Sequence, residues 1–297
     1  MLPVSVIVVS FNTRDLLREC LASVTDAAEV IVIDNASSDG SAEMVRGEFP
    51  QVQLISNEAN VGFGAANNQG LRVATQPYAL LLNSDAAAHP GAIAKLIEAM
   101  QDARRVVVGG KLVYPDGRFQ LSASNPLTLR VVFAEQFGLE KLIENYWIRS
   151  ETSQEVGQVM GACLMMRRID GRFMEFDEAM FLYCEDTELM HRLRAHGTVW
   201  YETSAVVTHH LGASSIENRH RSISLYNWGK EYYFRKHRGS GAAWLCWILD
   251  GAGAKLRMIA WALLAIPTLG RTWPRARMWW KVVMNLATHR PGGPPPR

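Results

Sequence analysis

The sequence contains few cysteines, and none of them is paired in a short motif. Among 297 residues the four cysteines stand far apart, at Cys20, Cys163, Cys184 and Cys246. This spacing excludes a recognisable disulfide framework or CxxC metal site, and it suits a reducing compartment. The first residues also lack the charged region, apolar core and cleavage site of a secretory signal, so we expect no such signal.

The C-terminal part lacks apolar runs of membrane-spanning length. Its uncharged stretches, Gly239–Leu249 and Met258–Gly270, flank a charged segment. Each is shorter than the roughly 18–20 apolar residues that a spanning helix requires. No internal repeat is visible, and the only low-complexity segment is Pro291–Arg297, which we expect to be disordered.

What is present is a globular composition with an uneven charge. Hydrophobic residues make up 48% of the chain and charged residues 20%, which excludes a wholly disordered protein. The net charge of +2 conceals a balance of −8 in residues 1–229 and +10 from Lys230 to Arg297. Eight of the nine tryptophans lie at or after Trp200. A basic, Trp-rich C-terminal part favours an anionic surface as its partner.

Strand and helix signals alternate through the first hundred residues. Helices are expected between the strands, the first capped by Thr13 and the last opened by Pro90. Such repeated units favour a doubly wound parallel sheet. The continuous apolar run Val4–Val9 predicts a strand buried on both faces, and Val30–Ile33, Val52–Ile55 and Tyr78–Leu82 are predicted as the next three strands.

After Arg105 the pattern changes. Val106–Val113 and Val159–Met166 read as strands without a second series of strand–helix units, so we expect them to extend the first sheet in mixed fashion. Val199–Tyr201 and Ala205–Thr208 are expected to be two short final strands. Residues 120–158 show weak periodicity, which favours a mobile region.

Polar residues follow several of the predicted strands. In open α/β sheets, ligands bind outside the carboxyl ends of the strands, so Asp34, Asp85 and the loop Asn60–Gly64 are expected to share one crevice. Asp34 could accept a hydrogen bond from a pyrimidine N3–H, or it could simply form a turn. Asn83 and Asp85 could hold a divalent ion against diphosphate oxygens, or the segment could cap a helix.

Two later pairs could also carry chemistry. Glu185 and Asp186 lie at the start of a predicted helix over Thr187–His196, where a carboxylate can act as a general base or merely complement the helix dipole. His209 and His210 end a strand, where a neutral imidazole could complete a metal site or lie on the surface. None of these signals is specific alone.

Together, however, the segments resemble family 2 glycosyltransferases of the GT-A fold, in the rhamnosyltransferase-like branch. Leu81–Asp85 matches the branch's variant of the Asp-x-Asp motif, and Phe181–Leu189 matches its acceptor-side Glu-Asp motif. The resemblance covers roughly residues 3–238 in the right order. The matching segments are Val4–Asn12, Val32–Ser41, Asn60–Asn68, Leu81–Asp85, Phe181–Leu189, His209–Ser214 and Tyr233–His237.

The resemblance implies roles for these residues. Asp186 would be the catalytic base, with Glu185 as its neighbour and second choice. Mg²⁺ or Mn²⁺ would be held by Asp85, Asn83 and His209. Many relatives carry Asp where this chain has Asn83, so the metal would be held less tightly or by Asp85 alone. The nucleotide sugar would be bound by Ser10, Asn12, Asp34, Asn35, Asn60, Gly62, Phe63, Asn67, Asn68, Asn83 and Ser84.

The implied reaction is a single inverting displacement. The fold implied is a Rossmann-like mixed sheet with helices on both faces. The metal would stabilise the charge that develops on the leaving nucleoside diphosphate, while Asp186 takes the proton of the acceptor hydroxyl. Within the branch dTDP-L-rhamnose is the favoured donor, and UDP- and GDP-sugars are alternatives. The acceptor is expected to be a lipid-linked sugar or polysaccharide in cell-surface glycan synthesis.

We expect a catalytic domain over residues 1–238, a helical membrane-associating extension over 239–290 and a disordered tail over 291–297. Trp244, Trp247 and Trp261 would lie at headgroup depth on the cytoplasmic membrane face, as in a peripheral or monotopic protein. The alternative is a soluble helical pair whose tryptophans pack on the catalytic domain. A basic aromatic strip could also meet nucleic acid, but nothing in the catalytic motifs requires it.

Two other functions are open on sequence. The neutral Asn83 is compatible with a catalytically silent subunit that binds a nucleotide sugar and scaffolds a membrane assembly. A nucleotidyltransferase ranks last, because no Gly-rich motif has a basic residue placed to activate a triphosphate. The sequence determines neither the acceptor and linkage nor the oligomeric state.

Overall fold

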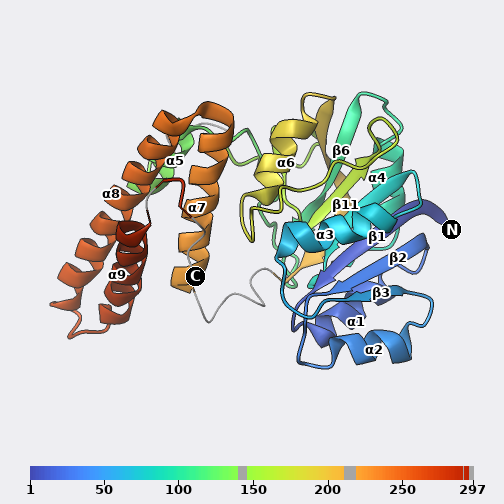
Figure 1. Cartoon of the computed structure of the whole chain (residues 1–297), viewed down its shortest axis with the longest axis horizontal. Coiled ribbons are helices and arrows are strands. Elements are labelled where there is room, and N and C mark those ends of the chain that lie inside the picture. The colour runs from blue at the N-terminus through green and yellow to red at the C-terminus, as the bar shows by residue number, and fades with distance from the viewer. Residues whose placement is uncertain (140–145, 211–218, 290, 294–297) are drawn as a thin grey trace. The chain divides into compact units, whose positions relative to one another are not determined.

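The structure is a computed structural model that describes residues 1–139, 146–210, 219–289 and 291–293. The chain forms two compact units, which are described separately below (Figure 1). The first unit comprises Met1–Pro126, Trp147–Phe181 and Glu185–Ser214, and the second comprises Leu127–Tyr146, Leu182–Cys184 and Ser215–Arg297.

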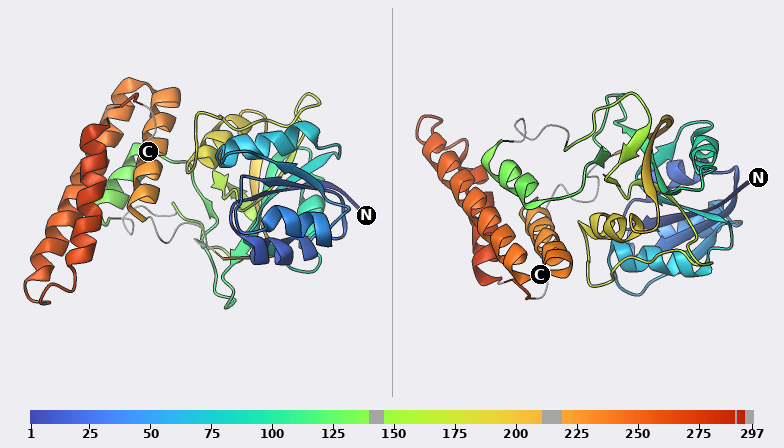
Figure 2. Two further views of the ribbon diagram at one scale, coloured as in Figure 1. Left: turned by 60° about the horizontal axis from the view of Figure 1, so that its bottom comes forward. Right: turned by 90° about the horizontal axis from the view of Figure 1, so that it is seen from above.

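The first unit is built around a mixed sheet with helices on both faces (Figure 2). The strand order is β3-β2-β1-β4-β10-β6-β11-β5, with β8 paired to β11, while β7 and β9 form a separate small sheet. Its elements in chain order are β1 (Leu2–Ser10), α1 (Arg14–Ala22), β2 (Ala27–Asp34), α2 (Ser41–Glu48), β3 (Gln53–Ser56), α3 (Phe63–Val73), β4 (Tyr78–Asn83), β5 (Ala86–Ala88), α4 (Ala92–Ala99), β6 (Arg105–Val113), β7 (Ala123–Ser124), β8 (Gln154–Val156), β9 (Gln158–Val159), β10 (Cys163–Arg167), α6 (Glu185–Leu193) and β11 (Thr198–His209).

Alternate residues of β1 enter two hydrophobic cores, one on each face of the sheet. Val6 and Val8 belong to the core that contains Leu17 of α1. Ile7 belongs to the other core, together with Leu71 of α3. Strands β1, β2, β3 and β4 are parallel, which confirms the doubly wound arrangement expected for the first hundred residues. Burial on both faces accounts for the continuous apolar runs of β1 and β4, whereas the residues of the edge strand β3 are half-buried or exposed.

The second half of the sheet is mixed, as expected. Strand β10 runs antiparallel to both β4 and β6. Two details differ from the sequence-based expectations. One strand, β11, replaces the two short strands, with an irregular register between Glu202 and Val206. Strand β5 pairs with β11 directly after Asp85, and three residues are too few to show a periodicity in the sequence.

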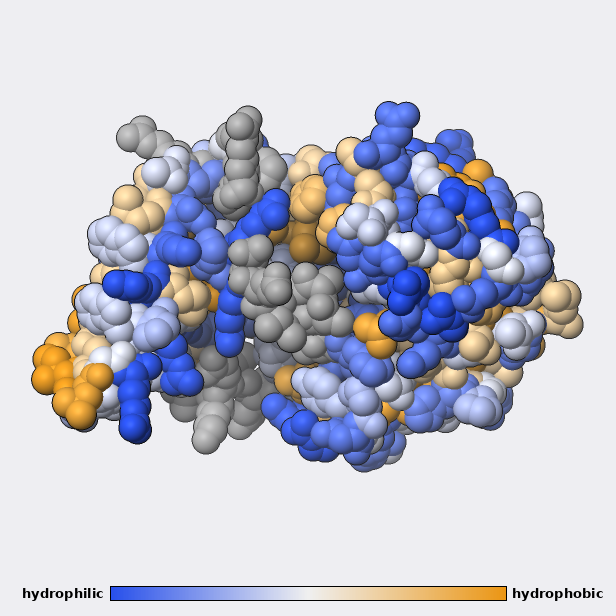
Figure 3. All heavy atoms as spheres, turned by 90° about the horizontal axis from the view of Figure 1, so that it is seen from below, coloured by the Kyte–Doolittle hydropathy of each residue, from blue (hydrophilic) through white to orange (hydrophobic). Residues whose placement is uncertain are grey.

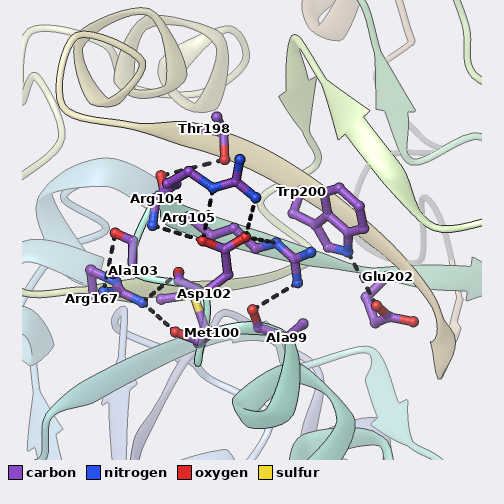
Figure 4. Close-up of polar contacts among 10 residues, drawn as sticks. All are labelled: Ala99, Met100, Asp102, Ala103, Arg104, Arg105, Arg167, Thr198, Trp200 and Glu202. Atoms are coloured by element: carbon purple, nitrogen blue, oxygen red, sulfur yellow. Dashed lines mark hydrogen bonds and ion pairs between the residues drawn. The ribbon is translucent and has the colours of Figure 1, made fainter.

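A polar cluster joins the ends of β6, β10 and β11 that lie away from the carboxyl end of β4 (Figure 4). Arg104 Nη2 donates to Asp102 Oδ2 at 2.8 Å, and Arg105 Nε lies 3.6 Å from the same oxygen. The Arg105 guanidinium stacks 3.7 Å from the centre of the Trp200 ring. Arg167 donates to the carbonyls of Met100 and Asp102. These contacts tie three strands to the segment after α4.

The second unit is helical. It contains α5 (Leu129–Phe137), α7 (Arg219–Arg238), α8 (Ser240–Ala265) and α9 (Trp273–Thr288). Lys230 of α7 and Asp250 of α8 are completely buried and lie 2.6 Å apart, and Gln136 of α5 donates to Asp250 at 2.8 Å. Helix α7, which we expected to close the catalytic domain, thus packs with the C-terminal helices. Within the described residues, no helix is long and apolar enough to cross a membrane.

Two weakly patterned segments contain more order than their sequences indicate. Residues 120–158, expected to be mobile, contain α5 and the short strands β7, β8 and β9, while 140–145 lie outside the described residues. Two residues of the tail expected to be disordered, 291–297, make hydrogen bonds. Gly292 N donates to Glu231 at 3.1 Å, and Gly293 O accepts from Trp228. Residues 294–297 lie outside the described part, so the predicted disorder is not tested there.

Candidate active site

The predicted site begins at the carboxyl ends of β1, β2 and β4, which are adjacent strands. Ser10 pairs with Asp34 across β1 and β2, and Val9 pairs with Asn83 across β1 and β4. Asp34 is buried; its Oδ2 accepts from the backbone N–H of Ser37 at 3.1 Å, whereas its Oδ1 has no hydrogen-bond partner among the described residues. A buried carboxylate oxygen in this state is available to a ligand donor.

Thr13 links the same strand ends. Its hydroxyl lies 3.2 Å from Ser10 Oγ and donates to Ser84 Oγ at 2.8 Å. It makes no side-chain capping bond to α1, contrary to the expected capping role. The residue therefore connects the loop after β1 to the loop after β4.

Hydrogen bonds join the loop after β1 to the loop after β2. Asn12 adopts φ 54° and Ala36 φ 66°, both in the left-handed region. Asn12 Oδ1 accepts from Ser38 N at 2.8 Å, and Asn12 N donates to Ser37 Oγ at 3.0 Å. These reciprocal bonds hold two strand-end loops together, which makes Asn12 a support for the backbone around Asp34.

Asn35 supports the loop before α3. Its Nδ2 donates to Asn60 Oδ1 at 2.9 Å, and its Oδ1 accepts from Val61 N at 3.1 Å. Gly62 has φ 91°, and a Cβ there would come within 2.7 Å of Phe181 O. Phe63 N donates to the same carbonyl at 3.0 Å. Only glycine fits this close approach.

Asn67 and Asn68 are engaged with protein groups. Asn67 Nδ2 donates to Phe63 O at 2.9 Å. The fully buried Asn68 accepts from Phe176 N at 2.8 Å and donates to Phe176 O and to Glu178. These contacts give both amides a structural position, while the predicted contact with the nucleotide sugar stays a prediction.

The three predicted metal ligands converge. His209 Nε2 lies 3.3 Å from Asp85 Oδ1 and 3.3 Å from Asn83 Nδ2. Asn83 Oδ1 is buried and has no hydrogen-bond partner among the described residues. His210 is displaced from this group, although its backbone N–H donates to Asp85 O at 2.9 Å.

Gln120 orients the imidazole and was missed by sequence reasoning. Its Oε1 lies 2.7 Å from His209 Nδ1, and its Nε2 donates to His209 O at 3.4 Å. Because an amide oxygen only accepts, Nδ1 donates to Gln120, and Nε2 is the ring nitrogen that lies toward Asp85 and Asn83. No signal in the sequence singles out a lone glutamine in a weakly patterned segment.

This donor set fits a hard divalent ion. Mg²⁺ is typically bound through one or two carboxylates and keeps other positions for phosphate and water. Asp85 supplies one carboxylate, His209 an oriented nitrogen and Asn83 an unpartnered oxygen. Among the described residues, no group of three or more His, Cys, Asp or Glu side chains could hold a metal by itself. A ligand's own oxygens would therefore have to complete the coordination.

Glu185 and Asp186 begin α6 rather than preceding it; Glu185 is buried and Asp186 is half-buried. Asp186 accepts from Gly161 N at 3.2 Å and from Thr187 N at 2.7 Å. Glu185 Oε2 has no hydrogen-bond partner among the described residues. Burial, and then the neighbouring Asp186, raise the pKa of Glu185 to about 8. Burial also raises the pKa of Asp186.

The two carboxyl groups therefore share a proton near neutral pH. Backbone N–H donors stabilise the charged form of Asp186, whereas Glu185 Oε2 lacks such donors. We assign the proton to Glu185 and the negative charge to Asp186. This is the arrangement that a general base at position 186 requires.

A two-residue segment connects the base to the metal group. Gly161 N donates to Asp186, and Ala162 O accepts from Asn83 N at 3.1 Å. Asp34, Asn83 and Glu185 also supply three of the five buried side-chain atoms that lack a partner in the described part of the chain. Buried atoms without partners cost free energy unless a ligand satisfies them, so their gathering at one end of the sheet marks a binding site.

The residues directly before the carboxylate pair are strained. Tyr183 and Cys184 adopt φ 70° and 66°, and both belong to the second unit. Within that unit a Cβ on Gly229 of α7 would lie 2.6 Å from Tyr183 O. Non-glycine residues rarely adopt this conformation in succession, and it persists only where the surrounding packing enforces it.

Comparisons with known proteins give the family. A family model described as Glycosyl transferase family 2 matches residues 5–169. The chain is 29% identical over 280 residues to an N-acetylglucosaminyl-diphospho-decaprenol L-rhamnosyltransferase of Mycobacterium tuberculosis, covering 83% of this chain and 89% of the relative. It is 28% identical to the succinoglycan biosynthesis protein ExoO of Rhizobium meliloti, covering 72% of this chain and 62% of that protein.

Solved structures agree with this fold. A mannosyltransferase from Pyrobaculum calidifontis, solved with GDP-Man and Mn²⁺, aligns with a TM-score of 0.56 at 16% identity, covering 96% of this chain and 87% of that chain. GalNAc-T7 with UDP, GalNAc and Mn²⁺ aligns with a TM-score of 0.54 at 16% identity, covering 80% and 51%. The mixed sheet thus has the GT-A architecture that the sequence motifs predicted. Since the family model covers more than half of its length, the chain belongs to glycosyl transferase family 2.

Proposed function

We propose that the protein is an inverting glycosyltransferase that uses a divalent metal and transfers a sugar from a nucleoside diphosphate donor to a lipid-linked or polysaccharide acceptor. The observation that carries this proposal is the gathering of unsatisfied buried atoms from Asp34, Asn83 and Glu185 around Asp85, Asp186 and His209. Family membership supports glycosyl transfer, and the residues of the site account for donor binding, metal binding and proton transfer.

Asp34 binds the nucleobase. Its free Oδ1 accepts the N3–H of a pyrimidine, while Oδ2 is held by Ser37. Ser10 and Asn35 flank the base. They are held in place by a hydrogen bond from Asn35 N to Ser10 O and by one from Asn35 Nδ2 to Asn60 Oδ1. The favoured donor is dTDP-L-rhamnose, in keeping with the rhamnosyl group in the name of the mycobacterial relative.

Asp85, Asn83 and His209 hold Mg²⁺ or Mn²⁺. When bound, the ion acts as a Lewis acid toward the diphosphate and neutralises the charge that it gains. Gln120 holds His209 Nδ1, which would leave Nε2 as the nitrogen that binds the ion. Asn83 contributes a neutral oxygen in place of a second carboxylate.

Asp186 is the general base. It accepts the proton of the acceptor hydroxyl as that oxygen forms a bond to C1 of the sugar and the bond from C1 to the diphosphate oxygen breaks. A single in-line displacement inverts the anomeric centre, and no covalent bond to the protein forms. Glu185, protonated at neutral pH, adds no second negative charge beside the base.

The protein acts at the cytoplasmic face of a membrane, as a peripheral or monotopic protein. The basic, Trp-rich helices after residue 238 support this location, and so does the decaprenol-linked substrate in the name of the mycobacterial relative. The same name supports a lipid-linked sugar as the acceptor class.

The test is transfer of sugar from a panel of dTDP-, UDP- and GDP-sugars with Mn²⁺ to diphospholipid-linked sugars, with the anomeric product identified by NMR. We expect one donor to give an inverted product, and we expect Asp85→Ala and Asp186→Asn each to lower kcat by roughly 10²–10⁴. Tight donor binding without turnover would instead support the scaffold function that the neutral Asn83 allows. Retention of the anomeric configuration would refute the single displacement.

A further inference from the structure

The hairpin formed by α8 and α9 ends in an apolar turn that the described residues of the second unit leave exposed. We infer that this turn and its flanking residues, which we call the hairpin tip (Leu263–Arg277), insert into the headgroup region of an anionic lipid bilayer. The inference deepens the proposed membrane location, and its test does not require glycosyl transfer.

The most exposed large apolar side chains of the described chain, apart from Met1, lie in the hairpin tip. Leu269 is 95% exposed and Ile266 is 75% exposed, and Leu263 and Trp273 beside them are also exposed. Figure 3 shows a patch of hydrophobic residues at the end of the hairpin. A cluster of this kind usually marks a contact with a membrane or another protein.

Two of the tryptophans that were expected to contact the membrane are engaged with other residues of the hairpin. Trp247 Nε1 donates to Leu286 O and His289 O of the α9 end, so this ring packs inside the hairpin. Trp261 is covered by the Arg275 guanidinium, 4.5 Å from its ring centre. Trp244 is exposed, but it lies near the opposite end of α8.

The positive charge of the hairpin tip favours anionic lipid. The chain has no acidic residue after Asp250, and the tip carries Arg271, Arg275 and Arg277. A basic residue near an anionic membrane surface strengthens binding by about fivefold. A second copy of the chain would bring the same cations face to face, so anionic lipid is the better partner.

The tip can enter the interface but not span the bilayer. None of the helices in the described ranges is apolar and long enough to cross a membrane. Exposed leucine and isoleucine beside tryptophan and arginine are the composition of an interfacial element. Leu256 and Ile259 along α8 are also exposed, but less than Ile266 and Leu269, so we place the insertion at the tip rather than along the whole helix.

The test is flotation of the full-length protein with vesicles of phosphatidylcholine alone and of equal parts phosphatidylcholine and phosphatidylglycerol. We expect binding only to the anionic vesicles. The double variant Ile266→Asn/Leu269→Asn should weaken it by at least about tenfold, because two exposed side chains lose their burial in the interface. Arg271→Gln should weaken it by about fivefold.

Leu245→Asn is the matched control. Leu245 is an exposed leucine of the same helix, about 30 Å from the turn, so the change should leave binding unaltered. Equal losses with Leu245→Asn would overturn tip insertion in favour of a helix lying flat. Unchanged vesicle binding by the double variant would overturn the inference outright. So would a wild type that binds no vesicles and forms, in gel filtration, a dimer that the double variant loses. Unchanged circular dichroism in the variants confirms that their fold is intact.

Discussion

Glu185 and Asp186 are adjacent in sequence but differ in their surroundings. Two backbone N–H groups stabilise the charge on Asp186, and Glu185 Oε2 has no such partner among the described residues. The first prediction concerns this difference. The pKa of Glu185 rises from an ordinary 4.5 to about 8 on folding, so its protonated form stabilises the fold. This contribution is complete below about pH 4.5 and disappears as the pH rises through about 8.

We therefore expect the free energy of unfolding of the wild type to fall between about pH 5 and about pH 9, with a slope of at most about 1.4 kcal/mol per pH unit. Glu185→Gln keeps a neutral side chain at all pH values and should remove this fall. Urea denaturation at several pH values measures it. An equal pH dependence in the variant would contradict the assignment of the proton.

The second prediction concerns the metal group. Asn83→Asp adds a carboxylate 3.3 Å from the imidazole of His209, at the atom position that is now a neutral amide. We expect the affinity for Mn²⁺ in the presence of nucleoside diphosphate to rise by about tenfold, because hard cations prefer charged oxygen ligands. Calorimetric titration with Mn²⁺ measures the change.

Gln120→Leu is the companion variant, since it removes the acceptor for His209 Nδ1–H. It should lower the Mn²⁺ affinity by about tenfold without removing a ligand. If neither variant alters Mn²⁺ binding, the metal is not held by this group.

At the scale of elements, two glycines of the helical unit give opposite predictions. Gly229 of α7 approaches Tyr183 O so closely that a Cβ would lie 2.6 Å from it, whereas a Cβ on Gly251 of α8 would meet nothing within 4 Å. We expect Gly229→Ala to destabilise the protein by about 1–3 kcal/mol through overpacking. Gly251→Ala should stabilise it by about 0.5–1 kcal/mol through helix propensity. Thermal unfolding of both variants measures this, and equal shifts would refute the close approach.

The Asp102 cluster gives another prediction at this scale. Hydrogen bonds from Arg104 hold the pKa of Asp102 below its usual value, so its charged form stabilises the junction of β6 and β11. We expect Asp102→Asn to lower the melting temperature at neutral pH, with the difference from the wild type shrinking progressively as the pH falls below about 4 and Asp102 becomes protonated. Asp116→Asn is the control, because Asp116 forms an ion pair with Arg118 of its own turn, two residues away, and should have a smaller effect. A difference that persists in acid would exclude the ion pair as its cause.

The elements also show which structure is predictable from sequence. Strands β1 and β4 are buried along most of their length, so their apolar runs identify them locally. Strands β5, β7 and β9 have two or three residues, and nothing in so short a segment separates a strand from a loop. The carboxyl-end rule located Asp34, Asn83 and Asp85, because it depends on topology alone. Gln120, Thr13 and Gly161 act through pairings distant in sequence, which periodicity does not reveal.

At the scale of the whole molecule, the charge division in the sequence corresponds to two kinds of chemistry. The first unit presents acidic and amide groups at the ends of parallel strands, as a nucleotide-sugar site requires. The second unit carries the excess of basic residues and the exposed hairpin tip. The expected boundary at residue 238 differs from the compact units, because the buried Lys230–Asp250 pair joins α7 to α8.

The most direct test of the proposed site is calorimetric titration of the protein with nucleoside diphosphates in the presence and absence of Mn²⁺. We predict that one nucleoside diphosphate binds only with Mn²⁺, and that Asp34→Ala and Asp85→Ala each weaken it by at least about tenfold while Asp102→Asn leaves it unchanged. Binding that depends neither on Mn²⁺ nor on Asp34 and Asp85, or no binding by the wild type, would contradict the proposed site.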